Sequence, residues 1–268
     1  MIPNWVKATV RLIPLVAFFS LIGVAGLCLF RLIVSFDDLK DASDAVGNYL
    51  QTVGSIYAVL LAFIVFVVWG QFNDSRTFVE GEAKALVDLH RTASGLPPRT
   101  RDQIQNALHV YVDEVLEKEW YAMAHRQEDV IEQVGHHLDD VWAAIHTCQP
   151  LNECQHTIYS EVLSRFNDLT DMRTSRLTSS RARIPLMMKF LLYLGAFIVI
   201  GSIYLMPVRP FWVHVVMSGS LAGAVAHILY LIADLDNAFD GYLIVSKDAF
   251  ERAKRTFGRD PQLSKAAA

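Results

Sequence analysis

Charged residues are missing from a long stretch in the first third of this chain. None of the residues from Ala45 to Asn73 is Asp, Glu, Lys or Arg, and Val53 to Trp69 is almost wholly apolar. An apolar stretch of about 17–20 residues is enough to cross a bilayer as a helix. No proline follows until Pro97. The lack of charge and proline predicts a single helix that crosses a membrane and continues into water as a polar rod.

Cysteine is scarce, with 3 residues in 268. Cys28 lies in an apolar segment, and Cys148 and Cys154 lie in a region that we expect on the cytoplasmic side, where disulfides are uncommon. We therefore expect reduced thiols. With His146 and His156, the last two cysteines offer zinc-binding residue types, but their spacing does not match common zinc modules. The pattern favours a polar loop.

Recognisable catalytic motifs are also missing. The chain has no Ser-His-Asp set, P-loop or glycine-rich dinucleotide fingerprint in a suitable context. We therefore expect neither an enzyme nor a cofactor. The pair Glu119-Trp120 fits a structural carboxylate beside a buried tryptophan, with an arginine of the same region as its partner, better than a catalytic acid. The net charge of −4 is modest and gives no indication of nucleic-acid binding.

Apolar residues are abundant, at 53%, and they gather in four segments. These segments cover roughly residues 12–32, 52–70, 184–206 and 211–233. Each is long enough to span a bilayer, so the sequence predicts four transmembrane helices. Small residues in the first and fourth segments, including Gly23, Gly219 and Gly223, are typical of closely packed membrane helices.

Lysine and arginine placement predicts the orientation of the spans. Lys7 and Arg11 precede the first span, and further basic residues follow the second span, precede the third and follow the fourth. The link between the third and fourth spans has only Arg209. We therefore expect both termini, and the long segment between the second and third spans, to lie in the cytoplasm. The membrane would be the inner (plasma) membrane of the cell.

The expected organisation is an all-α membrane protein in four parts. Residues 1–71 hold the first two spans, 72–183 form a cytoplasmic helical bundle, 184–233 hold the last two spans, and 234–268 form a cytoplasmic C-terminal tail. Apolar residues at helical spacing throughout the insert predict its bundle.

Short motifs through most of the chain resemble a known family. They are Gly54…Phe63…Trp69, Glu82-Ala83, Leu96-Pro97, Tyr111…Glu119-Trp120, Arg173-x-x-Arg176-Leu177 and Leu235-Asp236-x-x-Phe239-x-Gly241. Their order and spacing resemble the bestrophin-like domain of bacterial DUF4239 proteins. Ala238 departs from the proline of that pattern. The chain is more distantly similar to bestrophins, which are homopentameric anion channels with a narrow hydrophobic neck lined by the second span. The resemblance implies a cyclic homo-oligomer, a pentamer by analogy, that conducts chloride or other small inorganic anions.

The second span offers residues for such a neck. Ile56, Leu60, Phe63 and Val67 fall on one helical stripe and would form stacked apolar collars in a ring of subunits. A hydrophobic constriction can gate by losing its water. Every face of this span is apolar, so periodicity cannot choose the face that lines a pore. Polar residues could line the outer mouth, namely Asn48, Gln51, Thr52 and Ser55.

Two ionisable features near the fourth span have competing explanations. His227 could couple gating to pH, or it could be a neutral histidine bonded to a backbone or serine partner. Asp234, Asp236 and Asp240 could form a cation-binding turn, although they lack the dense carboxylates of a calcium loop. Aspartates at helix ends also cap local backbone.

Three classes of function remain open. The first is a homo-oligomeric ion channel, either anion-selective or, given an acidic link between the first two spans, cation-selective. The second is a non-conducting membrane sensor or scaffold that acts through the helical insert. A membrane enzyme is the weakest because no site supports it. The expected partners are the lipid bilayer, further copies of the chain and small inorganic ions.

Overall fold

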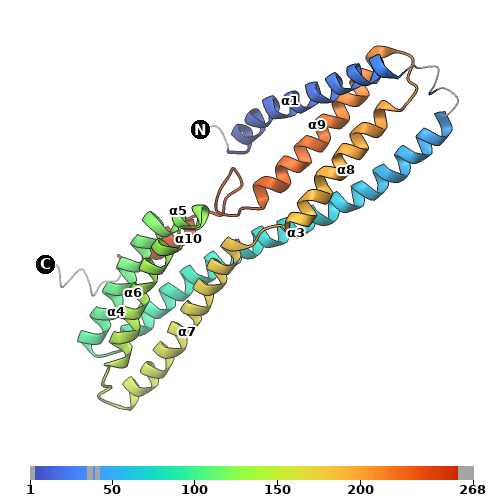
Figure 1. The fold of residues 1–268 in the computed structure, drawn as a ribbon. Coiled ribbons are helices and arrows are strands. Elements are labelled where there is room, and N and C mark those ends of the chain that lie inside the picture. The colour runs from blue at the N-terminus through green and yellow to red at the C-terminus, as the bar shows by residue number, and fades with distance from the viewer. Residues whose placement is uncertain (1–3, 35–38, 40–42, 259–268) are drawn as a thin grey trace. The chain divides into compact units, whose positions relative to one another are not determined.

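The computed structural model describes residues 4–34, 39 and 43–258, with side chains from residue 12 onward. All regular structure in these residues is helical (Figure 1), which confirms the all-α prediction. The elements are α1 (Asn4–Ile33), α3 (Ser43–Ala93), α4 (Pro98–Glu114), the π-helix η1 (Val115–Glu119), α5 (Trp120–His125), α6 (Glu128–His146), α7 (Glu153–Arg181), α8 (Leu186–Tyr204), α9 (Phe211–Leu235) and α10 (Asp248–Phe257).

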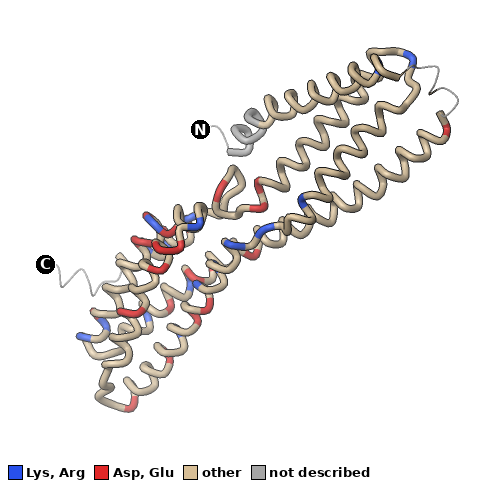
Figure 2. Tube along the Cα trace, viewed as in Figure 1, with Lys and Arg blue, Asp and Glu red and all other residues tan. Residues whose placement is uncertain are grey.

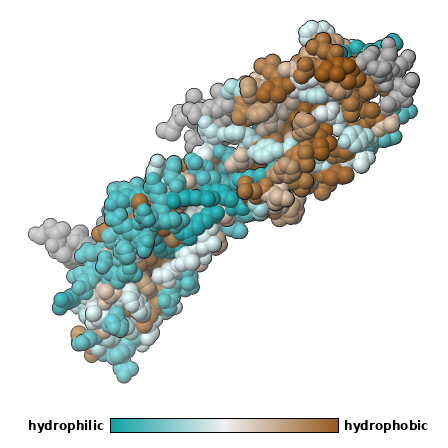
Figure 3. All heavy atoms as spheres, viewed as in Figure 1, coloured by the Kyte–Doolittle hydropathy of each residue, from teal (hydrophilic) through white to brown (hydrophobic). Residues whose placement is uncertain are grey.

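The chain forms two compact units. The apolar unit comprises Met1–Trp69 and Arg183–Asp236, and the polar unit comprises Gly70–Ala182 and Asn237–Ala268. Strongly hydrophobic residues gather on the visible face of the apolar unit, whereas hydrophilic residues dominate that of the polar unit (Figure 3). Lysine, arginine, aspartate and glutamate concentrate in the polar unit accordingly (Figure 2).

Four described helices are long and apolar enough to cross a membrane, as predicted. They are Leu12–Ile33, Ser43–Ala93, Glu153–Tyr204 and Phe211–Leu235. The third includes both α7 and α8, with a non-helical break that ends at Pro185. Helix α3 continues for 51 residues, or about 76 Å at 1.5 Å per residue. The prediction that one unbroken helix includes the apolar stretch and the polar residues after it is therefore confirmed.

Small residues set the packing of the apolar unit. A Cβ on Gly23 would lie 2.6 Å from the Cβ of Ala222, and a Cβ on Gly223 would lie 2.5 Å from the Oγ of Ser20. These glycines therefore allow α1 and α9 to approach closely, as the small-residue pattern predicted. On the other side of α9, α8 lies between α9 and α3 (Figure 1).

The C-terminal helix completes the core of the polar unit. Helix α10 is amphipathic and buries Ala249, Phe250, Ala253 and Phe257 in the hydrophobic core that α3, α4 and α5 also line. The Phe257 ring stacks on His90 of α3, with ring centroids 4.3 Å apart. The segment after the last span is therefore part of the same folded body as the insert.

Candidate functional site

Helix α3 has one packed face and one open face within the apolar unit. Tyr57, Leu61, Ile64 and Val68 are buried at successive spacings of four, three and four residues. The hydroxyl of Tyr57 donates a hydrogen bond to the backbone oxygen of Leu192 on α8, at 3.1 Å. This stripe is therefore the face by which α3 packs against the rest of its own chain.

The open face lies about 200° around the helix from the packed face. Val59 and Phe66 each come two residues after a buried position, and each residue advances about 100° around a helix. Their side chains are 71% and 76% exposed. Both are strongly apolar, so lipid or further protein must cover them in a membrane.

The predicted neck stripe lies between these two faces. Each of its residues directly precedes a buried position, which places the stripe about 100° from the packed face. Ile56 and Phe63 are exposed, at 66% and 56%, whereas Leu60 and Val67 are half-buried. The stripe of exposed apolar side chains is therefore Ile56, Val59, Phe63 and Phe66.

The predicted mouth residues are all exposed. Their hydrogen bonds to the helix backbone determine which side-chain donors remain for an ion. The hydroxyl of Thr52 donates to the backbone oxygen of Asn48 at 2.9 Å, and that of Ser55 donates to the backbone oxygen of Gln51 at 2.8 Å. Both hydroxyl protons thus point at the helix backbone. The side-chain donors that remain are the amide groups of Asn48 and Gln51, which can donate to an anion.

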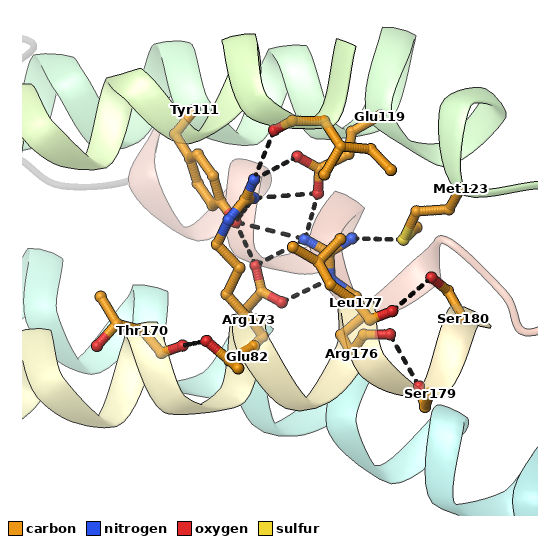
Figure 4. A network of polar contacts seen from close by, with 12 residues as sticks. Glu82, Tyr111, Glu119, Met123, Thr170, Arg173, Arg176, Leu177, Ser179 and Ser180 are labelled. Carbon is orange, nitrogen blue, oxygen red and sulfur yellow. Dashed lines mark hydrogen bonds and ion pairs between the residues drawn. The ribbon is translucent and has the colours of Figure 1, made fainter. Parts of the chain in front are cut away.

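In the polar unit, α3 joins a buried ionic network (Figure 4). Arg176 of α7 donates to Glu82 of α3, from Nε to Oε2 at 2.6 Å and from Nη2 to Oε1 at 3.1 Å. The same Nη2 also donates to Glu119 of η1 at 2.6 Å. Arg173, one turn earlier on α7, pairs with Glu119 at 2.8 Å. Two arginines and two glutamates are therefore paired in a buried site.

Tyr111 of α4 closes the network. Its hydroxyl donates to Oε1 of Glu82 at 2.5 Å and accepts from Nη1 of Arg173 at 2.7 Å. Burial, together with the nearby charge of Glu82, raises the pKa of Tyr111 well above its usual value. Tyr111 therefore stays a neutral hydrogen-bond donor.

The π-helix positions Glu119 for this network. A π-helix adds a residue to a helical turn, often at a functional or constrained position. Here the backbone oxygen of Leu116 accepts a hydrogen bond from Nζ of Lys247 at 2.8 Å. The predicted pairing of Glu119 with insert arginines beside a buried tryptophan is confirmed, since Trp120 is buried next to it.

The ionisable residues in and just after the fourth span do not form one site. His227 is exposed and lines a shallow groove with Ser20 and Ser220. Asp236 accepts a hydrogen bond from the backbone N–H of Ile184 at 2.6 Å, and it pairs with Lys189 at 2.7 Å. Both of its oxygens thus have protein partners.

Asp234 is half-buried and Asp240 is exposed. Across the described residues, no three side chains come together as a metal site. Asp37, Asp38 and Asp41 of the acidic link lie outside the described residues, as do the side chains of Lys7 and Arg11.

Comparison with known proteins places this arrangement in a family. A family model for the bestrophin-like domain matches residues 17–250. This chain belongs to the bestrophin-like family. A search of curated proteins finds no match.

Solved structures share the fold of this family member. A bestrophin homologue from Klebsiella pneumoniae matches with a TM-score of 0.68 and 13% identity, over 91% of this chain and 99% of its own. A point mutant of that homologue matches with the same TM-score and identity, over 92% of this chain and 99% of its own. At this identity, the likeness shows a common fold.

Proposed function

We propose that this bestrophin-like chain forms an oligomeric ion channel in which α3 of each copy faces a central pore. The observation that carries the proposal is the open apolar face of α3, opposite the face that packs on α8. In a closed ring of subunits, one such face from each copy would meet around the axis. The number of copies, five by analogy with bestrophins, is part of the proposal.

The exposed stripe defines the neck of the proposed pore. Ile56, Val59, Phe63 and Phe66 share one side of α3, and Leu60 and Val67 border it. Stacked apolar collars of this kind repel water and set an energetic barrier that a gate can use. The proposed neck therefore keeps Ile56 and Phe63 of the predicted stripe. Val59 and Phe66 take the places of Leu60 and Val67.

The mouth chemistry favours an anion such as chloride. Thr52 and Ser55 direct their protons to the backbone, while the amides of Asn48 and Gln51 can donate outward. An anion that sheds part of its water needs donors of this type. We further propose that the chain spans the bacterial inner membrane with both termini in the cytoplasm, because basic residues flank those ends.

Reconstitution in planar bilayers tests both conduction and selectivity. With a chloride gradient across the membrane, we expect a reversal potential that follows chloride. A reversal potential that follows potassium or sodium would establish the cation-selective alternative. A verified oligomer without current would favour a sensor or scaffold that acts through the polar unit.

Two neighbouring substitutions distinguish the faces of α3. Phe66→Ala removes a side chain from the proposed neck and should raise single-channel conductance. Val67→Ala, on the border of the packed face, is the matched control and should change conductance less. Phe197→Ala, on the exposed side of α8, should leave it unchanged. The proposed face is wrong if Phe66→Ala behaves like Phe197→Ala.

A further inference from the structure

The apolar unit contains a large groove on the surface of α9. It measures about 740 Å³ and has side chains of α1 and α8 as its two walls. Helix α9 lies between these two helices (Figure 1) and provides the floor. The floor holds the small side chains of Ala222 and Ala226, and Gly201 leaves space in the wall that α8 forms.

The lining of the groove is almost entirely apolar. Its lining includes three tyrosines, Tyr193, Tyr204 and Tyr230, and the hydroxyl of Tyr204 already donates to the backbone oxygen of Gly23 at 2.8 Å. A polar or charged occupant would lose more hydration there than these few hydroxyls could replace. The occupant must therefore be a hydrocarbon or an apolar protein segment.

The dimensions favour a hydrocarbon chain. Along α8 the groove extends from Tyr193 to Tyr204, or about 16 Å at 1.5 Å per residue. One leaflet of a bilayer has a hydrocarbon depth of about 15 Å, half of the whole core. The groove is therefore about as long as one acyl chain lies deep in a leaflet, so an extended acyl chain can lie along it.

A cation lies just beyond one end of the groove. Tyr193, Leu229 and Ala233 line both the groove and a small adjoining pocket of about 80 Å³. Lys189 lines that pocket one helical turn before Tyr193, on the same side of α8.

Lys189 retains capacity for a further partner. Its side chain is 34% exposed, and its ammonium group donates one hydrogen bond to Asp236. An ammonium has three N–H donors, so two remain for a ligand. Asp236 holds the ammonium in place at the end of the groove, while its other oxygen accepts from the backbone of Ile184.

We propose that this groove binds an anionic phospholipid of the surrounding bilayer. One acyl chain fills the groove between α1 and α8, and the phosphate-containing headgroup accepts hydrogen bonds from Lys189. All lipids offer acyl chains, so the charge on Lys189 provides the preference for an anionic headgroup. This site lies within one compact unit and does not depend on ion conduction.

Two lipids with the same acyl chains test the headgroup preference. The purified full chain in detergent receives dioleoyl phosphatidylglycerol, which is anionic, or dioleoyl phosphatidylcholine, which is net neutral. A ligand that binds the folded state raises the melting temperature by mass action. We expect phosphatidylglycerol to raise Tm by several degrees more than phosphatidylcholine, and native mass spectrometry to retain more of it. Equal shifts and equal retention would overturn the proposal.

Substitutions at Lys189 test the source of this preference. Lys189→Gln should bring the two lipids to equal retention, and Lys189→Arg should keep the preference because it keeps the charge. A preference that survives in Lys189→Gln would overturn the assignment of the headgroup.

Gly201 allows the groove itself to be tested without a clash at the backbone. A Cβ on Gly201 would meet no atom within 4 Å, so Gly201→Leu adds its side chain to the empty groove. Gly54→Leu on α3 is the matched control, since its Cβ is also unobstructed and lies outside the groove. We expect Gly201→Leu to lose retained lipid and Gly54→Leu to keep it. If Gly201→Leu retains as much lipid as the wild type, the proposal is overturned. The same holds if Gly201→Leu changes the number of chains in the assembly but not the amount of retained lipid.

Discussion

Arg176 of α7 holds both carboxylate oxygens of Glu82 of α3, in a site where neither side chain reaches water. Removing one member of a buried pair leaves the other as an uncompensated charge, which costs about 3–5 kcal/mol. We therefore expect Arg176→Met to lower the free energy of unfolding by about this amount. Chemical denaturation of the full chain in detergent, followed by tryptophan fluorescence, measures the change.

The exposed pair Arg76–Glu80 provides the control for this prediction. It joins the same residue types on the surface of α3, at 3.2 Å. Pairs of this kind contribute about 0–1 kcal/mol because water screens their charges. Arg76→Met should therefore leave the unfolding midpoint nearly unchanged. Similar losses in Arg176→Met and Arg76→Met would show that burial does not determine the strength of the Arg176–Glu82 pair.

Docking of α10 should make stability depend on pH through His109. Its ring lies against Phe257, with centroids 5.0 Å apart. Burial lowers the pKa of His109, Asp113 opposes this effect, and the ammonium of Lys254 adds to it. The unfolded chain therefore takes up a proton on this ring at a higher pH than the folded chain does. Stability from the neutral ring is complete above the unfolded pKa of about 6.5 and falls as the pH drops toward the lower folded pKa.

Melting temperatures at pH 7.5 and pH 5.5 check the role of His109. The wild-type chain should melt at a lower temperature at pH 5.5, and His109→Gln should narrow the difference. His136, which is exposed and pairs with Asp139, provides the control. His136→Gln should keep the wild-type difference. An unchanged difference in His109→Gln would exclude its ring as the source.

Much of the fold follows from the sequence because the strongest signals are simple. An apolar segment longer than about 17 residues identifies a span without any knowledge of its neighbours. Apolar residues at helical spacing likewise predict the helices of the insert. They do not indicate that Phe257 packs on His90 and His109, because these residues lie well over a hundred positions earlier in the chain. Packing between distant segments is a property of the folded chain.

Two features of the candidate site could not be predicted from sequence patterns. The second span is apolar on every side, so hydrophobic periodicity could not separate Val59 and Phe66 from the buried Tyr57 and Ile64. The hydrogen bond from Tyr57 to Leu192 distinguishes the two faces. The π-helix that carries Glu119 has no propensity signal, since it differs from an α-helix by one residue in a single turn.

Gly195 provides a final test of how α3 is held. A Cβ at this position would lie 2.5 Å from Cδ2 of Tyr57, well inside van der Waals contact. The ring of Tyr57 is buried and its hydroxyl is bonded to Leu192, so it cannot move away freely. Inserting an atom into such a contact costs about 1–3 kcal/mol. We expect Gly195→Ala to lower the free energy of unfolding by this amount.

Gly201 lies six residues further along α8. Gly201→Ala is the control that distinguishes the clash at Gly195 from the general effect of alanine in a helix. Its Cβ would meet no atom within 4 Å. Alanine favours a helix over glycine by up to about 1 kcal/mol, so Gly201→Ala should be neutral or stabilising. Thermal unfolding of the two variants in the same detergent compares them directly. If Gly195→Ala also stabilises the chain, the contact between Tyr57 and α8 does not fix the rotation of α3. The assignment of a packed face and an open face to α3 would then be wrong.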